Sequence, residues 1–222
     1  MTGFAPLRIT SSRAFPLRLD FHMDVAHGLA SRAFSDNVFV EFRSASGFAG
    51  FGECVPRTYV TGETPASVLV AIPAIAVRFE GTVFRSPGEL ADALGEEGNS
   101  TAHPAAFCAV ELALLDLAGR HWNIPATAVA GLGILRDPLF YSLVVPLLND
   151  DAVEKFLKYT AKFRFSQVKV KVDGNDPAAR VRLVKSHVAP DMEIRVDANC
   201  SWARSDAHSF IDDLAAEGVV SV

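Results

Sequence analysis

The chain has 222 residues, of which 50% are hydrophobic, and this is enough for one or two domains with ordinary cores. Its formal net charge is −5 and its Lys and Arg residues are dispersed, which excludes a strongly basic nucleic-acid-binding surface. No stretch approaches the roughly 20 apolar residues that span a bilayer, and the three cysteines form no CxxC pair. We therefore expect a cytoplasmic protein with reduced thiols that binds neither nucleic acid nor a membrane.

The first 125 residues have the pattern of an α+β domain. Strands and one hairpin are predicted first, at residues 7–9, 15–21, 37–43 and 48–54. Three helices, each with a proline in its first turn, are predicted next, at residues 65–79, 87–95 and 104–122. Strands followed by helices in this order predict an α+β fold.

After residue 125 the predicted strands and helices alternate. Strands are predicted at residues 139–145, 167–173, 193–199 and 218–222. Helices are predicted at residues 150–163, from Asp176 and Pro177 onward, and at residues 203–216. This alternation predicts a parallel sheet, either open or closed into a barrel.

Three charged residues lie on two successive predicted strands of this sheet. Lys169 and Lys171 are two residues apart, so their side chains share one face of a strand, and Asp197 lies on the next strand with Asn199 two positions further. Charge in the middle of a parallel α/β sheet is costly unless it does chemistry or holds an ion. The alternative interpretation is a solvated sheet face followed by a turn or a helix N-cap.

These segments resemble the enolase superfamily, and within it the muconate-lactonizing-enzyme-like subgroup of the mandelate racemase/muconate lactonizing enzyme family. The Lys-x-Lys of residues 169–171 is similar to the family's second barrel strand, and residues 196–199, Val-Asp-Ala-Asn, to its third-strand metal motif. The similarity extends over the first domain through residues 50–57, 61–64 and 109–119.

The resemblance implies a fold with two parts. Residues 1–125 are expected to form an α+β capping domain, similar to the enolase N-terminal domain. Residues 126–222 are expected to form the first three βα units and the fourth strand of a partial (β/α)8 TIM-type barrel. The family's later metal ligands and its second catalytic lysine have no counterpart in these residues. We therefore expect the chain alone to be inactive, and to be a homo-oligomer or to need a complementing chain.

The resemblance also implies a chemistry, which is removal of a proton α to a carboxylate by an isomerase or lyase: an epimerase, racemase or cycloisomerase. It implies Mg²⁺ as the cofactor, Asp197 as one metal ligand, Lys171 as the base, and Lys169 beside it near a small carboxylate substrate. Asn199 is expected to orient the site and to bind the substrate, although a structural turn amide is an equal alternative.

The first domain adds two further expectations from the resemblance. A loop at residues 25–34 is expected to close over the substrate, where Arg32 would bind the substrate carboxylate. A solvated loop arginine is the alternative interpretation of Arg32. Residues 61–64, Thr-Gly-Glu-Thr, favour the dipeptide-epimerase branch.

Two other functions remain open from the sequence. The chain could be a non-catalytic binding or oligomerisation module, or half of a split barrel that another polypeptide completes. It could also be a small open α/β protein whose lysine pair binds an anion.

Overall fold

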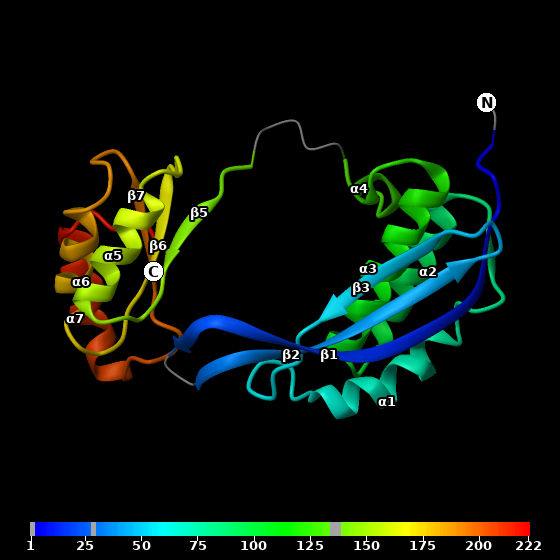
Figure 1. The fold of residues 1–222 in the computed structure, drawn as a ribbon, viewed down its shortest axis with the longest axis horizontal. Helices are drawn as coiled ribbons and strands as arrows, with labels where there is room; N and C mark the ends of the chain where they lie inside the picture. Colours follow the sequence, from blue (N-terminus) through cyan, green and yellow to red (C-terminus); the bar gives the residue numbers. More distant parts are fainter. Residues whose placement is uncertain (1–2, 28–29, 134–138) are drawn as a thin grey trace. The chain divides into compact units, whose positions relative to one another are not determined.

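The computed structural model describes residues 3–27, 30–133 and 139–222. Contacts divide the chain into two compact units, the first of Met1–Asp20 with Phe34–Arg136 and the second of Phe21–Ala33 with Asp137–Val222 (Figure 1). Each unit has its own hydrophobic core. The predicted domain boundary at residue 125 stays a prediction, as does the assignment of the two parts to a cap and a barrel.

A four-stranded sheet in the order β3-β2-β1-β4 lies in the first unit, except for the end of β1 and the start of β2, which belong to the second unit. Its strands are β1 (Leu7–His27), β2 (Ala30–Ser44), β3 (Ala49–Cys54) and β4 (Val83–Phe84). The predicted hairpin is confirmed, because β2 and β3 pair antiparallel with Phe42 opposite Gly50. Gly47 has a φ of 87°, a conformation that favours glycine, at the turn where the Ser44 amide donates to the Phe48 carbonyl oxygen at 3.0 Å.

Two sequence predictions about these strands are wrong. The separate strands predicted at residues 7–9 and 15–21 are one continuous strand, β1. The loop predicted at residues 25–34 belongs to β1 and β2, apart from residues 28–29, which lie outside the described residues. β1 and β2 are hydrogen-bonded neighbours in the sheet. This pairing extends both strands beyond the ends that were predicted from the sequence.

Helices of the first unit pack on one side of this sheet (Figure 1). They are α1 (Pro65–Ala76), α2 (Pro87–Ser100), α3 (Pro104–Trp122) and the short α4 (Ala126–Val129), which the sequence did not predict. Thr64 and Ser67 form a reciprocal capping box at the start of α1, and the Ser86 side chain caps α2. These caps confirm the predicted helix starts.

Helix α2 is longer than predicted, since it continues past Gly95 to Ser100. One glycine in a helix interior costs about 1 kcal/mol, a penalty that buried contacts can offset. Leu90, Leu94 and Glu97 line the buried face of α2, and Glu97 forms an ion pair with Arg78. Tertiary packing therefore outweighs the helix-ending preference of Gly95.

Helix α3 lies in the centre of the first core and touches β3 very closely. Gly50 and Gly52 point toward α3, and a Cβ atom at Gly52 would overlap the backbone of Ala109 and Ala113. No side chain fits between strand and helix at these two positions. The two glycines therefore allow the backbones to approach each other.

The start of α3 is capped from a distant part of the chain. His103, the residue before the helix, makes no side-chain cap bond. Instead the buried Glu63 carboxylate accepts hydrogen bonds from the Ala105 amide at 2.7 Å and the Ala106 amide at 3.1 Å. An anion at a helix N-terminus also interacts favourably with the helix dipole. Glu63 thus joins the turn before α1 to the central helix.

We expect Glu63→Ala to lower the free energy of unfolding by about 2 kcal/mol, because one buried and one partly buried amide donor lose their acceptor. Glu63→Gln should cost less, since one amide oxygen can still accept. Urea unfolding followed by circular dichroism measures the change. The matched control is Glu96→Ala on the exposed face of α2, which should change the unfolding free energy by less than about 0.5 kcal/mol. Equal losses for Glu63→Ala and Glu96→Ala would contradict the capping role.

The second unit contains a parallel sheet in the order β5-β6-β7. It consists of β5 (Ser142–Val145), β6 (Gln167–Lys171), β7 (Glu193–Asp197) and the helices α5 (Asp150–Thr160), α6 (Pro177–Lys185) and α7 (Arg204–Ala216). This confirms the predicted strand–helix alternation and parallel pairing. The strand predicted at residues 218–222 is reduced to a single bridge between Ser221 and Arg195.

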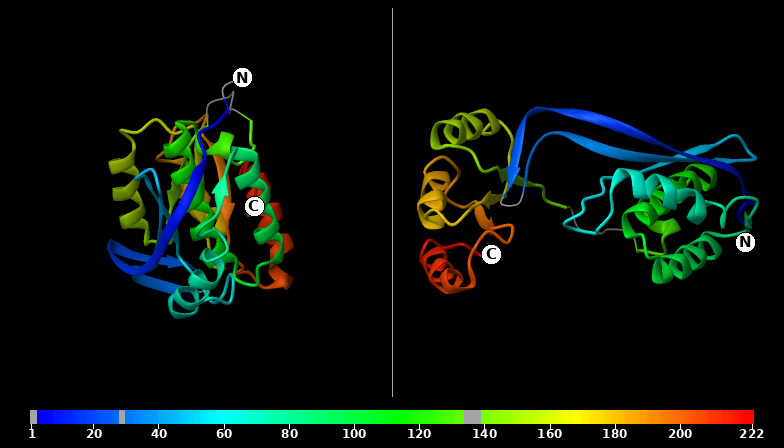
Figure 2. Two further views of the ribbon diagram at one scale, coloured as in Figure 1. Left: turned by 90° about the vertical axis from the view of Figure 1, so that its right-hand side faces the viewer. Right: turned by 90° about the horizontal axis from the view of Figure 1, so that it is seen from below.

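The three helices of the second unit cover one face of its sheet (Figure 2, where they are coloured yellow to red). Alternate residues of the strands point into the core beneath the helices, including Val168, Val170, Ile194 and Val196. The other strand residues therefore lie on the face that the helices leave uncovered.

The cysteines differ in environment. Cys54 is buried at the end of β3, and burial raises the pKa of its thiol to about 12, with smaller contributions from Cys108 and nearby carboxylates. Burial also raises the pKa of the Cys108 thiol. No helix in the described part of the chain is both long and apolar enough to cross a membrane.

Candidate functional site

The uncovered face of the parallel sheet is polar. Strand β6 contributes Gln167, Lys169 and Lys171 to it, and β7 contributes Glu193, Arg195 and Asp197, in matching register. The two strands run in the same direction, so Lys171 and Asp197 both end their strands at the carboxyl edge of the sheet. Ligands and reacting groups in parallel α/β folds gather at this edge.

The predicted lysines and aspartate lie together. The Lys169 Nζ atom is 3.2 Å from the Asp197 Oδ2 atom, and Lys171 is the direct register partner of Asp197. The Lys169 side chain is 37% exposed and the Asp197 side chain 27% exposed, so the pair is neither buried in the core nor fully solvated. Two cationic side chains and one carboxylate therefore occupy one small area of the sheet edge.

The surroundings of Asp197 favour its charged form. Partial burial raises the pKa of this carboxyl, but the hydrogen bond from Lys169, the hydrogen bond from the Asn199 amide and the charges of both lysines lower it by more. The Asp197 pKa therefore lies below its ordinary value, and the carboxylate is ionised at neutral pH. An ionised carboxylate is able to bind a divalent cation.

A tight turn follows Asp197. Asn199 has a φ of 47° and Cys200 a φ of 57°, so two successive non-glycine residues adopt the left-handed conformation. The main-chain N–H of Asn199 donates to the Asp197 Oδ1 atom at 3.1 Å. The Asn199 Nδ2 atom is buried and has no hydrogen-bond partner among the described residues. The predicted substrate-binding role of Asn199 stays a prediction.

One polar row of this face was missed in the sequence. The Ser142 hydroxyl donates to the Gln167 Oε1 atom at 3.0 Å, and the Gln167 Nε2 atom donates to the Glu193 Oε2 atom at 2.9 Å. These residues lie at the amino ends of three adjacent strands. Gln167 lies two residues before Lys169 on β6, and Glu193 lies four residues before Asp197 on β7. Because alternate residues of a strand share a face, the sequence pattern could have predicted both.

The donor set fits Mg²⁺ only in part. Mg²⁺ takes oxygen ligands, usually one or two carboxylates together with water and substrate oxygens. Asp197 provides one such carboxylate, and no group of three or more metal-ligating side chains is found within the described ranges. The described residues can therefore supply one ligand of a magnesium site, with Lys169 already paired to one of its oxygens.

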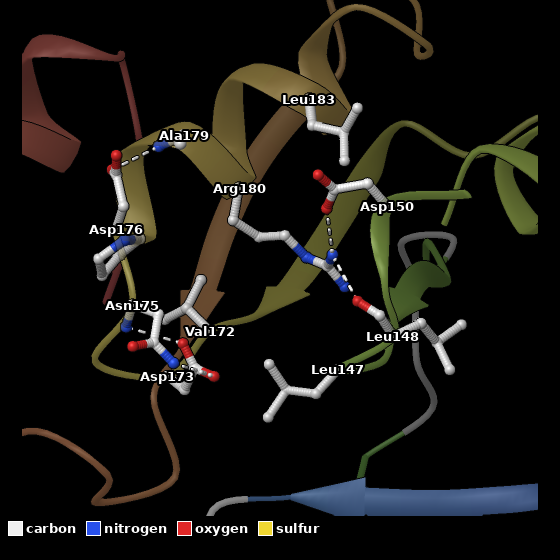
Figure 3. Close-up of a pocket in the computed structure, with 11 residues that line it drawn as sticks. Leu147, Leu148, Asp150, Val172, Asp173, Asn175, Asp176, Ala179, Arg180 and Leu183 are labelled. Atoms are coloured by element: carbon white, nitrogen blue, oxygen red, sulfur yellow. Dashed lines mark hydrogen bonds and ion pairs between the residues drawn. The ribbon is translucent and has the colours of Figure 1, made fainter. Parts of the chain in front are cut away.

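A second cluster lies beside this edge, between the segments that follow β5 and β6 (Figure 3). The guanidinium of Arg180 donates to the Leu148 carbonyl oxygen at 2.7 Å and to the Pro146 carbonyl oxygen at 2.8 Å. Burial lowers the Arg180 pKa, whereas the charges of Asp150 and Asp173 act in the opposite direction. Arg180 thereby ties α6 to the segment after β5.

The cavity beside Arg180 has a volume of about 250 Å³. Its lining contains three carboxylates and the Arg180 guanidinium, which are Asp150, Asp173, Asp176 and Arg180 (Figure 3). The guanidinium disfavours a bound cation, and the carboxylates disfavour a bound anion. We interpret the cluster as structural. The cluster was not predicted from the sequence, because the two closest partners of Arg180 are main-chain oxygens more than 30 residues away and its third partner, Asp150 at 3.5 Å, is 30 residues away.

Arg32 lies in β2, with a partly buried side chain, and not in the parallel sheet that carries the lysines and Asp197. Its predicted role at a substrate carboxylate stays a prediction.

The chain is similar in sequence to known proteins. Residues 151–222 match the family model described as Enolase C-terminal domain-like. The chain is 30% identical over 190 residues to the hydrophobic dipeptide epimerase of Citrifermentans bemidjiense, covering 83% of this chain and 50% of that protein.

Solved structures show the same fold. A dipeptide epimerase from Enterococcus faecalis V583, complexed with Mg and the dipeptide L-Leu-L-Tyr, superposes with a TM-score of 0.83 at 24% identity, covering 96% of this chain and 59% of that one. A mandelate racemase/muconate lactonizing protein from Herpetosiphon aurantiacus superposes with a TM-score of 0.80 at 25% identity, covering 97% and 60%. The chain thus spans 50% to 60% of the length of these relatives.

Proposed function

We propose that the chain forms the N-terminal part of an isomerase of the enolase superfamily, because residues 151–222 match the enolase C-terminal domain-like family model and the chain is similar to a dipeptide epimerase. This isomerase abstracts a proton α to a carboxylate and is an epimerase, racemase or cycloisomerase. The observation that carries the proposal is the contact of Lys169 with Asp197, together with the register pairing of Lys171 and Asp197 at the carboxyl edge.

We assign residues 1–125 to a capping domain and residues 126–222 to a partial (β/α)8 barrel. Three parallel strands with their helices on one face support this assignment, as do the superpositions on longer enolase-superfamily chains. The polar face then corresponds to the inside of the barrel, and the carboxyl edge to its active end.

In the proposed reaction Lys171 accepts the α-proton of the substrate, and delivery of a proton to the opposite face of the same carbon completes the isomerisation. Lys169 and Lys171 are two residues apart on one strand, so both side chains reach the same substrate. The Lys169 ammonium attracts the substrate carboxylate and holds the Asp197 carboxylate in place. In the resembled family a second lysine from a later strand acts on the opposite face of the substrate.

Magnesium is the proposed cofactor, and its charge would offset the negative charge that develops on the substrate carboxylate oxygens. Asp197 is the proposed ligand in this chain, because its carboxylate is ionised and lies at the carboxyl edge. Longer relatives would supply the remaining ligands from later strands.

The proposed substrate is a small carboxylate of the dipeptide or N-acyl amino acid class. The names of the relatives support this class, since they include dipeptide epimerases and an N-succinyl-L-Arg/Lys racemase. The Thr61–Thr64 segment adds less support than its sequence suggested, because Glu63 is engaged in capping α3. We further propose a cytoplasmic location, and a homo-oligomer or a complementing chain as the functional assembly.

The cation site is tested with Mn²⁺, a paramagnetic substitute for Mg²⁺, by water-proton relaxation on the 222-residue chain. We expect weak binding that Asp197→Asn reduces by about tenfold or more. Asp212→Asn, on the exposed face of α7, is the matched control and should bind as the unaltered chain does. Circular dichroism establishes that both variants are folded. Equal Mn²⁺ affinity in the two variants would remove Asp197 from the metal site.

A further inference from the structure

The turn after Asp197 adopts a costly conformation. Asn199 and Cys200 both have a positive φ, which is disfavoured for residues other than glycine, less for asparagine than for cysteine. Such a conformation persists only when surrounding contacts hold it in place. The contacts that hold this turn therefore also determine where the Asp197 carboxylate lies, since Asn199 donates to Asp197.

Trp202 provides the shorter of two side-chain hydrogen bonds from this turn to the segment after β6; the other runs from the Ser201 hydroxyl to the Val172 carbonyl oxygen at 3.5 Å. Its Nε1 atom donates to the Asp173 carbonyl oxygen at 2.9 Å, and its ring packs against Phe210 of α7 with centroids 5.2 Å apart. Within the turn, the Ser201 amide donates to the Ala198 carbonyl oxygen at 2.9 Å. One indole thus joins the turn to a neighbouring segment and to a helix.

The segment that Trp202 binds is the one that directly follows Lys171. Val172 and Asp173 continue the chain beyond β6 at the edge of the cavity beside Arg180 (Figure 3). The Val172 amide donates to the Asp197 carbonyl oxygen at 3.1 Å. Two hydrogen bonds therefore connect the segment after Lys171 with the segment that contains Asp197. One joins Val172 to Asp197, and the other joins Asp173 to Trp202.

We propose that Trp202 is a positioning residue, whose indole N–H locks the strained turn against the end of β6 and so fixes Asp197 relative to Lys171. This inference rests on the proposed function, because it assigns Trp202 to the placement of the metal ligand and the base. Trp202 itself touches neither of these side chains in the described contacts.

The chain contains a matched control. Trp122, the only other tryptophan, lies in the first unit and donates its Nε1 hydrogen to the Ala5 carbonyl oxygen at 2.8 Å. Trp122→Phe therefore removes a bond of the same kind, far along the chain from Asp197. Trp202→Phe keeps a ring that can pack against Phe210 but removes the donor.

The experiment compares the 222-residue chain, Trp202→Phe and Trp122→Phe by amide hydrogen exchange and by Mn²⁺ binding. For Trp202→Phe we expect exchange about tenfold faster at residues 172–175 and 198–203, and Mn²⁺ affinity about tenfold weaker. For Trp122→Phe we expect faster exchange only in the first unit and unchanged Mn²⁺ affinity. Replacing Trp202 by His, which keeps a ring N–H donor, should restore part of the lost protection.

The outcomes separate this proposal from the proposed function. If the unaltered chain binds no Mn²⁺, the cation part of the proposed function fails, and the exchange data alone decide the role of Trp202. Faster exchange confined to the two segments supports positioning. If Trp202→Phe leaves both segments as protected as Trp122→Phe does, or accelerates exchange in them no more than elsewhere in the second unit, the positioning role is overturned.

Discussion

Replacing Gly52 by alanine is expected to destabilise the first unit by about 3 kcal/mol or more, an effect that among the described glycines only Gly50 should match. A Cβ atom at this position would overlap the Ala109 carbonyl oxygen and approach the Ala113 amide nitrogen within 2.5 Å. Both clashing atoms belong to the backbone of α3, so no side-chain rotation relieves the overlap. Strand and helix would have to move apart.

The cost follows from the position of α3. Nine residues of α3 are buried, and the helix packs against β3 and α1 in the centre of the first core. Overpacking of well-packed cores typically costs about 1–3 kcal/mol, and a backbone clash lies at or above the upper end. A loss of about 3 kcal/mol or more is a large part of the 5–15 kcal/mol that holds a typical domain together.

Gly95→Ala is the matched control for this prediction. Gly95 lies within α2 and has no neighbouring atom within 4 Å of the added Cβ. Alanine is the better helix former, so this variant should be about 1 kcal/mol more stable. Thermal unfolding of both variants gives the comparison. A Gly52→Ala protein as stable as the unaltered chain would mean that α3 and β3 lie further apart than the structure places them.

The 222-residue chain is expected to associate when it is purified alone. Among the described residues, β5 has a sheet neighbour only on the side of β6, so its other edge has free main-chain groups. Leu139, Phe140 and Tyr141, which precede β5, are 72%, 71% and 84% exposed. Unpaired strand edges recruit other strands, and contiguous exposed apolar side chains drive association.

Light scattering after size-exclusion chromatography tests this expectation. We expect a mass of at least twice 23.9 kDa, and a shift toward the monomer when Phe140 and Tyr141 are both replaced by lysine. Val70→Lys is the control, because Val70 is equally exposed but lies on α1 of the first unit. A monodisperse monomer of 23.9 kDa with one cooperative unfolding transition would show that the edge is not a site of association.

Local signals in the sequence were sufficient for most helix starts and for the central residues of the site. Thr64 and Ser86 cap their helices as predicted, because an N-cap bond involves residues only three positions apart. Lys169, Lys171 and Asp197 lie together because the two-residue period of strands and the parallel pairing of successive βα units are regular. The helix caps need only local geometry, and the site needs only the regular pairing of successive parallel strands.

Contacts between distant segments were not predictable in this way. The cap of α3 comes from Glu63, which precedes the residues that it binds by about 40 positions. Arg180 binds main-chain carbonyl oxygens, which carry no side-chain signature. The length of β1 depends on pairing with β2, and strand ends set by a partner strand are not encoded in the strand itself.

The central claim is that Lys169, Lys171 and Asp197 form one part of a site for abstracting a proton α to a carboxylate. It is tested most directly by exchange of the α-proton of dipeptides in D₂O with Mg²⁺, followed by NMR. Two samples are compared: the 222-residue chain with its mass verified, and a fusion in which the later strands of the Enterococcus faecalis relative follow Val222.

We predict no exchange by the 222-residue chain, and exchange by the folded fusion that Lys171→Met reduces by at least about 100-fold. Clear exchange by the chain alone that persists after Lys171→Met would contradict the account. So would a folded fusion that binds Mg²⁺ and substrate but exchanges no α-proton.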